Sequence, residues 1–150
     1  MSKIAVMDST THRVRLISPT TLRYRCLHCA ALCCLLGGPV VSGKDVERLS
    51  QIRPLQSDWL VETRMGDVRK SSLRSKPTGE CVFLQRRRDE YRCSVYDYRP
   101  KVCRSFPFVL KRKNQFIEFF VLPCRGLNSR EGIRLDEEFV RDLATSALTP

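Results

Sequence analysis

Four cysteines fall within nine residues of this chain, from Cys26 to Cys34, and this cluster constrains the fold more than any other feature. Four more follow singly along the chain, at Cys81, Cys93, Cys103 and Cys124. Thiolates are strong ligands for zinc and for iron–sulfur clusters, and one metal needs about four ligands from different parts of a chain. We therefore expect the cluster to be a hub onto which the later cysteine-bearing segments fold.

The spacing inside the cluster indicates which thiols share a metal. Cys26 and Cys29 have the C-x-x-C step that lets two sulfurs reach one ion, and Cys33 shares their face if the segment is helical. Cys33 and Cys34 are adjacent and point differently, so they serve two metals, or one lies outside the ligand set. The alternative for a single cysteine is a small buried apolar residue, but four in nine residues favour ligation. The predicted metal ligands are Cys26, Cys29, Cys33, Cys34, Cys81, Cys93, Cys103 and Cys124.

The length and charge of the chain limit its class and its partners. A chain of 150 residues suits one small domain, which we predict over residues 1–150. No secretory leader and no stretch of about 20 apolar residues is visible, so we expect a cytoplasmic protein with reduced thiols and no membrane contact. The net charge of +11 favours an acidic partner, either nucleic acid or an acidic protein.

Short periodic segments separated by turns predict a small α+β domain of strands, hairpins and three to four helices, organised around the cysteine-ligated metal site. We expect strands over residues 13–17, 22–26, 81–84 and 91–95, and a hairpin over residues 106–122. The candidate helices cover residues 27–36, 42–54, 57–64, 99–107 and 136–148. Ser42 and Asp45 form a near capping box for the second of these helices, and Asp97 is the expected cap of the helix that carries Cys103.

Several charged, aromatic and imidazole side chains have more than one interpretation. Arg86–Arg88 and Lys111–Lys113 are predicted at turn tips, where solvated charge that blocks edge pairing is favoured over a grip on phosphates. The phenylalanines between Phe106 and Phe120 are predicted in the core rather than on a surface where bases stack. Arg99 beside Cys103 either donates to cluster sulfurs or packs on a nearby aromatic ring. His28 is predicted as a turn residue, not a ligand.

The order of the motifs around the cysteines is more specific than the cluster. Downstream come G-E-C-V-F-L from Gly79, C-S-V-Y from Cys93, R-P-K-V-C-R-S-F-P-F from Arg99, and C-R-G from Cys124. This order resembles the YkgJ-type cysteine-cluster family, the C-x-x-C-x-x-C-C zinc- or iron-chelating domain, over a core of about residues 24–126. The resemblance implies a metal site made by eight recurring cysteines. One departure is that three residues separate Cys29 from Cys33, where the family usually has two, often beginning with glycine.

Three functions remain open at this point. The first is a metal-binding protein that chelates zinc or iron, with a 4Fe-4S cluster as one form of the iron. The second is an iron–sulfur-dependent redox or modifying enzyme, because the resemblance extends distantly to flagellin lysine methylases. The third is a basic adaptor that binds nucleic acid and carries structural zinc. No H-E-x-x-H, phosphate-cradling glycine loop or G-x-S-x-G motif is present, so no catalytic residue is assigned.

Overall fold

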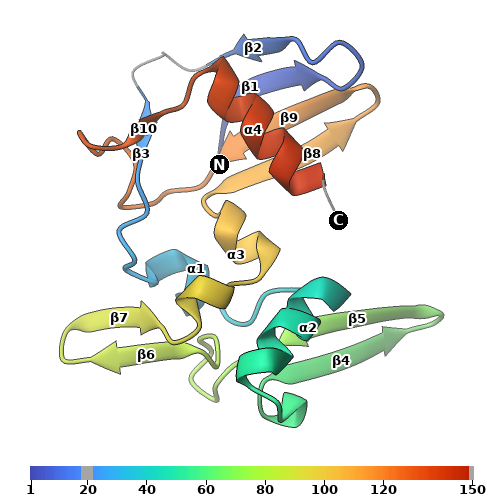
Figure 1. Ribbon diagram of the computed structural model, residues 1–150, viewed down its shortest axis with the longest axis vertical. Helices are drawn as coiled ribbons and strands as arrows, with labels where there is room; N and C mark the ends of the chain where they lie inside the picture. Colours follow the sequence, from blue (N-terminus) through green and yellow to red (C-terminus); the bar gives the residue numbers. More distant parts are fainter. Residues whose placement is uncertain (18–21, 149–150) are drawn as a thin grey trace. The chain divides into compact units, whose positions relative to one another are not determined.

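The computed structural model describes residues 1–17 and 22–148, and within them it contains four α-helices and ten short strands (Figure 1). The predicted α+β class is confirmed. The chain divides into two compact units: the first joins Met1–Leu27 with Ser105–Pro150, and the second is His28–Arg104. Each unit has its own hydrophobic core. The prediction of one domain over residues 1–150 stays a prediction.

The first unit is built on a four-stranded antiparallel sheet with the strand order β2-β1-β9-β8. Its strands are β1 (Ser2–Asp8), β2 (Val14–Leu16), β8 (Phe108–Lys113) and β9 (Phe116–Val121). The predicted hairpin over residues 106–122 is present as β8 and β9, and Asn114 has a positive φ of 57° in its turn, a conformation that asparagine tolerates. The sequence analysis placed Lys111–Lys113 at a turn tip, but these residues belong to strand β8.

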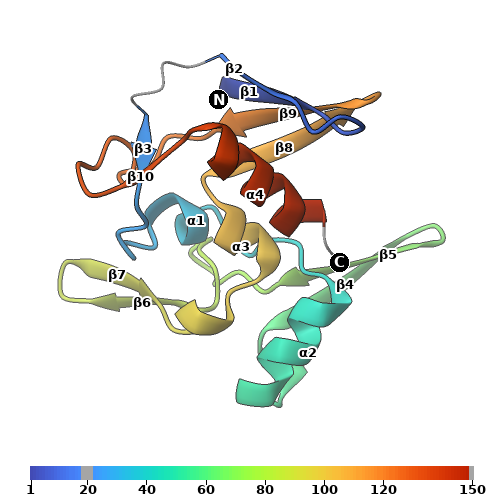
Figure 2. The same ribbon diagram turned by 45° about the horizontal axis from the view of Figure 1, so that its top comes forward.

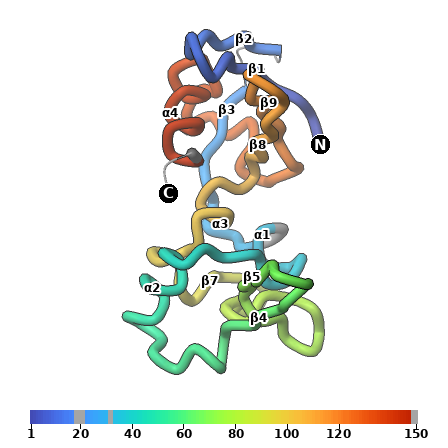
Figure 3. Tube along the Cα trace, turned by 90° about the vertical axis from the view of Figure 1, so that its right-hand side faces the viewer, coloured from blue at the N-terminus to red at the C-terminus, as the bar shows by residue number. Residues whose placement is uncertain are grey.

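Helix α4 (Glu137–Leu148) covers one face of this sheet (Figures 1 and 3). Its start is capped by Asp136, whose Oδ1 accepts a hydrogen bond of 2.9 Å from the amide of Phe139. The centre of its apolar stripe, Val140 and Ala144, is buried in the same core as Phe119 of β9. The predicted helix over residues 136–148 is therefore present. A shorter pair, β3 (Arg23–Tyr24) with β10 (Ile133–Arg134), completes the unit.

In the second unit, one helix contains the end of the cysteine cluster and a second helix follows it. α1 (Ala31–Leu35) has five residues, fewer than the predicted span of 27–36, and Gly37 follows it with a φ of 105°. α2 (Gly43–Ile52) begins at the predicted capping box: the Ser42 hydroxyl accepts from the Asp45 amide, and the Asp45 carboxylate accepts from the Ser42 amide. Leu49 on α2 is fully buried, so this helix anchors the core of the unit.

Two hairpins and a third helix make up the rest of the second unit. The hairpins are β4 (Leu60–Met65) with β5 (Val68–Leu73), and β6 (Leu84–Arg87) with β7 (Glu90–Cys93) (Figure 2). α3 (Lys101–Ser105) carries Cys103. Its first amide, on Lys101, donates to Asp45 Oδ1 at 3.1 Å, so the cap comes from Asp45 and not from the predicted Asp97.

The predicted helix over residues 57–64 was wrong. A single 3-10 turn (Gln56–Asp58) leads into strand β4 instead, and Met65 at the end of this strand is 81% exposed. β4 pairs along its whole length with β5, and the sequence analysis predicted neither strand. Because the outer half of this two-stranded ribbon is exposed on both faces, its sequence shows no alternation of apolar and polar residues.

Candidate metal centre

Six of the eight predicted ligands lie in the second unit, and four of these belong to its hydrophobic core. Cys34 on α1 and Cys81 are buried at 5% and 3% exposure. Cys33 on α1 and Cys93 at the end of β7 are partly buried and pack against the same core. Thiols from three separate stretches of the chain thus share one apolar environment, as the hub hypothesis predicts.

Backbone hydrogen bonds join these three stretches. The amide of Cys81 donates to the carbonyl of Cys34 at 2.8 Å, and the amide of Leu84 donates to the carbonyl of Cys81 at 3.0 Å. Leu84 is in turn the β6 partner of Cys93 in the β6–β7 hairpin. A continuous set of main-chain contacts therefore leads from helix α1 to the end of β7.

Three of the thiols interact directly. The Cys34 side chain is hydrogen-bonded to those of Cys33 and Cys93. These hydrogen bonds lower the pKa of Cys33 and the pKa of Cys93 to about 7, because they stabilise the two thiolates. The pKa of Cys34 is raised, since its proton is held between the two neighbours and its thiol is also buried. The arrangement favours a central thiol between two thiolates near neutral pH.

Two further thiols of the unit are electrostatically linked to this trio. Burial raises the pKa of Cys81, and it raises the pKa of Cys103 to about 12. The charges of Cys33 and Cys93 contribute to both increases. Cys29, the sixth thiol of the unit, lies in the segment just before α1.

Two cations act on these thiols, Arg99 on Cys33, Cys93 and Cys103, and Lys76 on Cys81. The charge of Arg99 favours the three thiolates, although burial still raises the pKa of Cys103. The guanidinium lies 3.8 Å from the centre of the Tyr96 ring, and its Nε donates to the Tyr96 carbonyl at 3.0 Å. Of the two roles considered for Arg99, packing on an aromatic ring is present, and its charge also reaches the sulfurs.

Tyr96 is a functional candidate that the sequence interpretation missed. The His28 ring stacks on it at 3.9 Å between ring centres, with 19° between the planes. His28 has a positive φ of 55°, as expected of the predicted turn residue. The contact ties the segment between Cys26 and Cys29 to the segment after Cys93. The only sequence signal for it was the presence of aromatic side chains close to cysteines at both places.

The remaining two predicted ligands, Cys26 and Cys124, lie in the first unit on neighbouring segments. The amide of Arg25 donates to the carbonyl of Gly126 at 3.0 Å, and the amide of Gly126 donates to Cys124 Sγ at 3.5 Å. These contacts place the residue before Cys26 against the turn that carries Cys124. The segments that carry the two cysteines therefore lie side by side in this unit.

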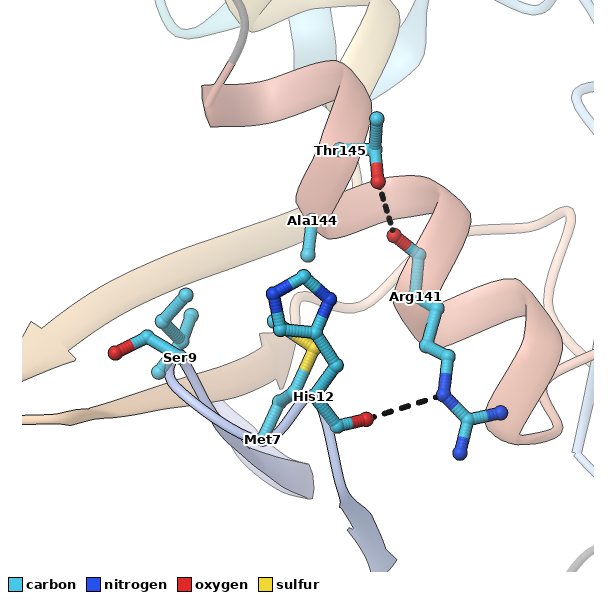
Figure 4. A pocket seen from close by; sticks show the side chains of 7 residues that line it. Met7, Ser9, His12, Arg141, Ala144 and Thr145 are labelled. Atoms are coloured by element: carbon cyan, nitrogen blue, oxygen red, sulfur yellow. Dashed lines mark hydrogen bonds between the residues drawn. The ribbon is translucent and has the colours of Figure 1, made fainter.

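A pocket of about 250 Å³ in the first unit contains none of the predicted ligands. Its lining residues are Met7, Ser9, His12, Ile117, Arg141, Ala144 and Thr145. Figure 4 shows the His12 ring beside Ala144 and Met7, with Arg141 Nε donating to the His12 carbonyl at 3.1 Å. The lining contains one imidazole and no acidic or thiol side chain, so the pocket does not have the donors of a metal site.

Within residues 1–17 and 22–148, no three cysteine, histidine or acidic side chains are spaced to hold one metal ion. The eight-ligand set therefore stays a prediction. The chemistry of the donors nevertheless fits zinc or iron, because four soft sulfur donors, Cys33, Cys34, Cys81 and Cys93, share a largely apolar core.

These features define the class of the protein: it is a cysteine-rich α+β protein in which several thiols lie in the core of its second unit. Residues 25–125 match the profile of the family described as "CxxCxxCC: Putative zinc- or iron-chelating domain". The match covers more than half of the chain, and the protein belongs to this family. The resemblance drawn from the cysteine motifs is thus confirmed.

One relative is the uncharacterized protein MJ0661 of Methanocaldococcus jannaschii, which is 25% identical over 130 residues. The alignment takes in 79% of this chain but 65% of that protein, so the chain spans just under two thirds of its relative's length. No solved structure matches the chain. Among the described residues, no helix is both long enough and apolar enough to cross a membrane.

Proposed function

We propose that this protein binds zinc or iron through thiolates in the core of its second unit, with Cys34 at the centre. The observation that carries the proposal is the Cys34 sulfur, which is hydrogen-bonded to the sulfurs of Cys33 and Cys93. Thiols must lose their protons to ligate a metal, and binding releases those protons. Thiols that the fold brings together in one core are therefore suited to share one cation.

The other cysteines extend this set. We propose Cys81 and Cys103 as ligands because their pKa values respond to the charges of the same sulfurs, and Cys29 because it lies next to α1. We also propose Cys26 and Cys124, on neighbouring segments of the first unit, as the remaining two of the eight ligands. When bound, the metal supplies a crosslink between stretches of the chain, and its binding free energy adds to the stability of the fold.

The protein's own residues prepare this site in two ways. Arg99, fixed on the Tyr96 ring, offsets part of the negative charge that accumulates when several thiols ionise. The apolar core around Cys34 and Cys81 keeps water from competing for the sulfurs. We further propose a reducing compartment, the cytoplasm, because ligation requires that the eight thiols stay reduced.

The test is elemental analysis combined with an ultraviolet–visible spectrum of protein purified without oxygen. We expect zinc or iron in stoichiometric amounts. A colourless sample containing zinc identifies zinc thiolate sites, whereas a brown sample that absorbs near about 400 nm identifies an iron–sulfur cluster. A folded protein that contains neither metal, and takes up neither when it is supplied, contradicts the proposal.

Variants locate the ligands. Cys34→Ser and Cys93→Ser should lower the metal content per chain and weaken binding of added metal. Val95→Ala is the matched control, because Val95 is 2% exposed in the same core and its truncation removes packing but no donor. Cys26→Ser and Cys124→Ser report whether the pair in the first unit also binds. Unchanged metal content and affinity in Cys34→Ser would remove Cys34 from the centre of the site.

A further inference from the structure

The four-stranded sheet of the first unit has one covered face and one open face. Along β9 the residues alternate strictly: Ile117, Phe119 and Val121 are buried, whereas the side chains between them are not. The buried residues share the core that contains Val140 and Ala144 of α4. On β8 and β9, every residue of the opposite face is half-buried or exposed, within the part of the chain that the structure describes. This second face of the sheet is open.

Lysine and phenylalanine side chains alternate on the open face. Cross-strand pairing places Lys113 opposite Phe116, and Lys111 opposite Glu118. In an antiparallel pair, opposite residues lie on the same face. Phe120 on the same face is paired with Lys3 of β1. We call these six residues the basic strip: Lys3, Lys111, Lys113, Phe116, Glu118 and Phe120.

The charges of the basic strip converge. Lys3 and Lys111 place their ammonium groups 5.7 and 5.1 Å from the centre of the Phe120 ring. Glu118 pairs with Lys3 at 2.5 Å, and its pKa is lowered by that lysine and by the charges of Lys113 and Lys111. The strand register also places Asp8 of β1, opposite Phe116, and Arg15 of β2 on this open face. Its four basic side chains, Lys3, Arg15, Lys111 and Lys113, against the two carboxylates of Asp8 and Glu118 leave two positive charges, on a chain whose net charge is +11.

Phe116 gives the strip a second chemical character. Its side chain was expected in the core, but it is 43% exposed, whereas Phe108 and Phe119 are buried as expected. An exposed ring at the end of a basic strand offers a surface on which a base can stack, while the lysines contact phosphates. An acidic protein would satisfy the lysines but has no specific use for the exposed ring.

We propose that the basic strip binds single-stranded nucleic acid, with Phe116 stacking on a base and Lys111 and Lys113 contacting the backbone. This site is independent of the metal proposal, because none of its residues is a cysteine or touches one in the described contacts. The interpretation of Lys111–Lys113 as a solvated turn is thereby replaced by a role on the face of a strand.

The experiment measures fluorescence anisotropy of a labelled ten-nucleotide single strand, RNA or DNA, with the full chain at several salt concentrations. Three variants are compared: Phe116→Ala, the double variant Lys111→Gln with Lys113→Gln, and Arg112→Gln. Arg112 is the matched control, because it is an exposed cation on the same strand, opposite Ile117 on the other face. Circular dichroism verifies that each variant is folded.

We expect Phe116→Ala to weaken binding by about fivefold or more, since stacking on one base is worth about 1–3 kcal/mol. The double lysine variant should reduce the slope of log affinity against log salt by about 1.4, at about 0.7 for each lost phosphate contact. Arg112→Gln should change binding much less than either. The proposal is overturned if Arg112→Gln weakens binding as much as the strip variants do, or if the protein does not bind the oligonucleotide at low salt. It is also overturned if polyglutamate binds equally well and its binding depends on Phe116 to the same extent.

Discussion

Replacing Gly126 with alanine should force apart the two segments that carry Cys26 and Cys124. A Cβ atom at this position would lie 2.1 Å from the carbonyl oxygen of Arg25, and real Cβ contacts are essentially never shorter than 3.0 Å. The segments must therefore move apart by about 0.9 Å at this point. The 3.0 Å hydrogen bond from the Arg25 amide to the Gly126 carbonyl then lengthens beyond the normal range of about 2.7–3.2 Å.

The expected loss of stability follows from the bonds at stake. One backbone hydrogen bond contributes about 1 kcal/mol. The next bond, from the Asn128 amide to the Arg23 carbonyl at 2.7 Å, is disturbed by the same shift. We expect Gly126→Ala to lower the free energy of unfolding by about 1–3 kcal/mol. Urea denaturation of the reduced, metal-free protein measures the total, and hydrogen exchange at the amides of Arg25 and Asn128 measures the local effect.

Gly43→Ala is the matched control for this experiment. It makes the same chemical change at the first residue of α2, where no atom lies within 4 Å of the added Cβ. Alanine there should be neutral or stabilising by up to about 1 kcal/mol. If Gly126→Ala is as stable as Gly43→Ala and the Arg25 amide keeps its protection, the close approach of the two segments does not depend on glycine and the reasoning fails.

Two further predictions concern the second unit. In the reduced, metal-free protein, Cys33 and Cys93 should react with iodoacetamide at half-maximal rate near pH 7, because hydrogen bonds from Cys34 lower the pKa of each to about 7. Cys103 should react only in strong alkali, because burial raises its pKa to about 12. Mass spectrometry of each site gives the profiles, and identical profiles for all three would contradict the assignment. Asp45→Ala should lower the free energy of unfolding by about 2–3 kcal/mol, since it removes the carboxylate that caps α2 and accepts from the first amide of α3. In the same denaturation assay the exposed turn residue Asp67 should tolerate alanine within about 0.5 kcal/mol, and an equal loss at both sites would contradict the capping role.

The elements that the sequence predicted well are those specified by local signals. The capping box at Ser42 and Asp45 needs only four consecutive residues, and the structure contains it as predicted. The hairpin of β8 and β9 is likewise encoded by two apolar runs around a short polar turn. Cys34 illustrates the limit for the site: its position in a cluster predicted a metal role, but its hydrogen bond to Cys93 depends on a pairing between segments 59 residues apart.

The elements that the sequence interpretation missed depend on partners far away or on exposure. β1 has a local partner in β2, but β2 is only three residues long, and the strand that pairs along most of β1 is β9, far away in the sequence. The β4–β5 ribbon shows no alternation, because much of it is exposed on both faces. The contact of Tyr96 with His28 joins residues 68 positions apart, so aromatic composition alone did not reveal it. Phe116 was assigned to the core because a phenylalanine in a strand is usually buried.

The pairing of β1 with β9 also sets the order in which the newly made chain can fold. Ser2 pairs with Val121, so β1 leaves the ribosome 119 residues before its partner is complete. At a synthesis rate of about 5–20 residues per second, β1, with only the short strand β2 beside it, waits about 6–24 s for β9. The hairpins of the second unit are local and complete during that interval. The unit that contains six of the thiols can therefore fold before the sheet of the first unit is complete.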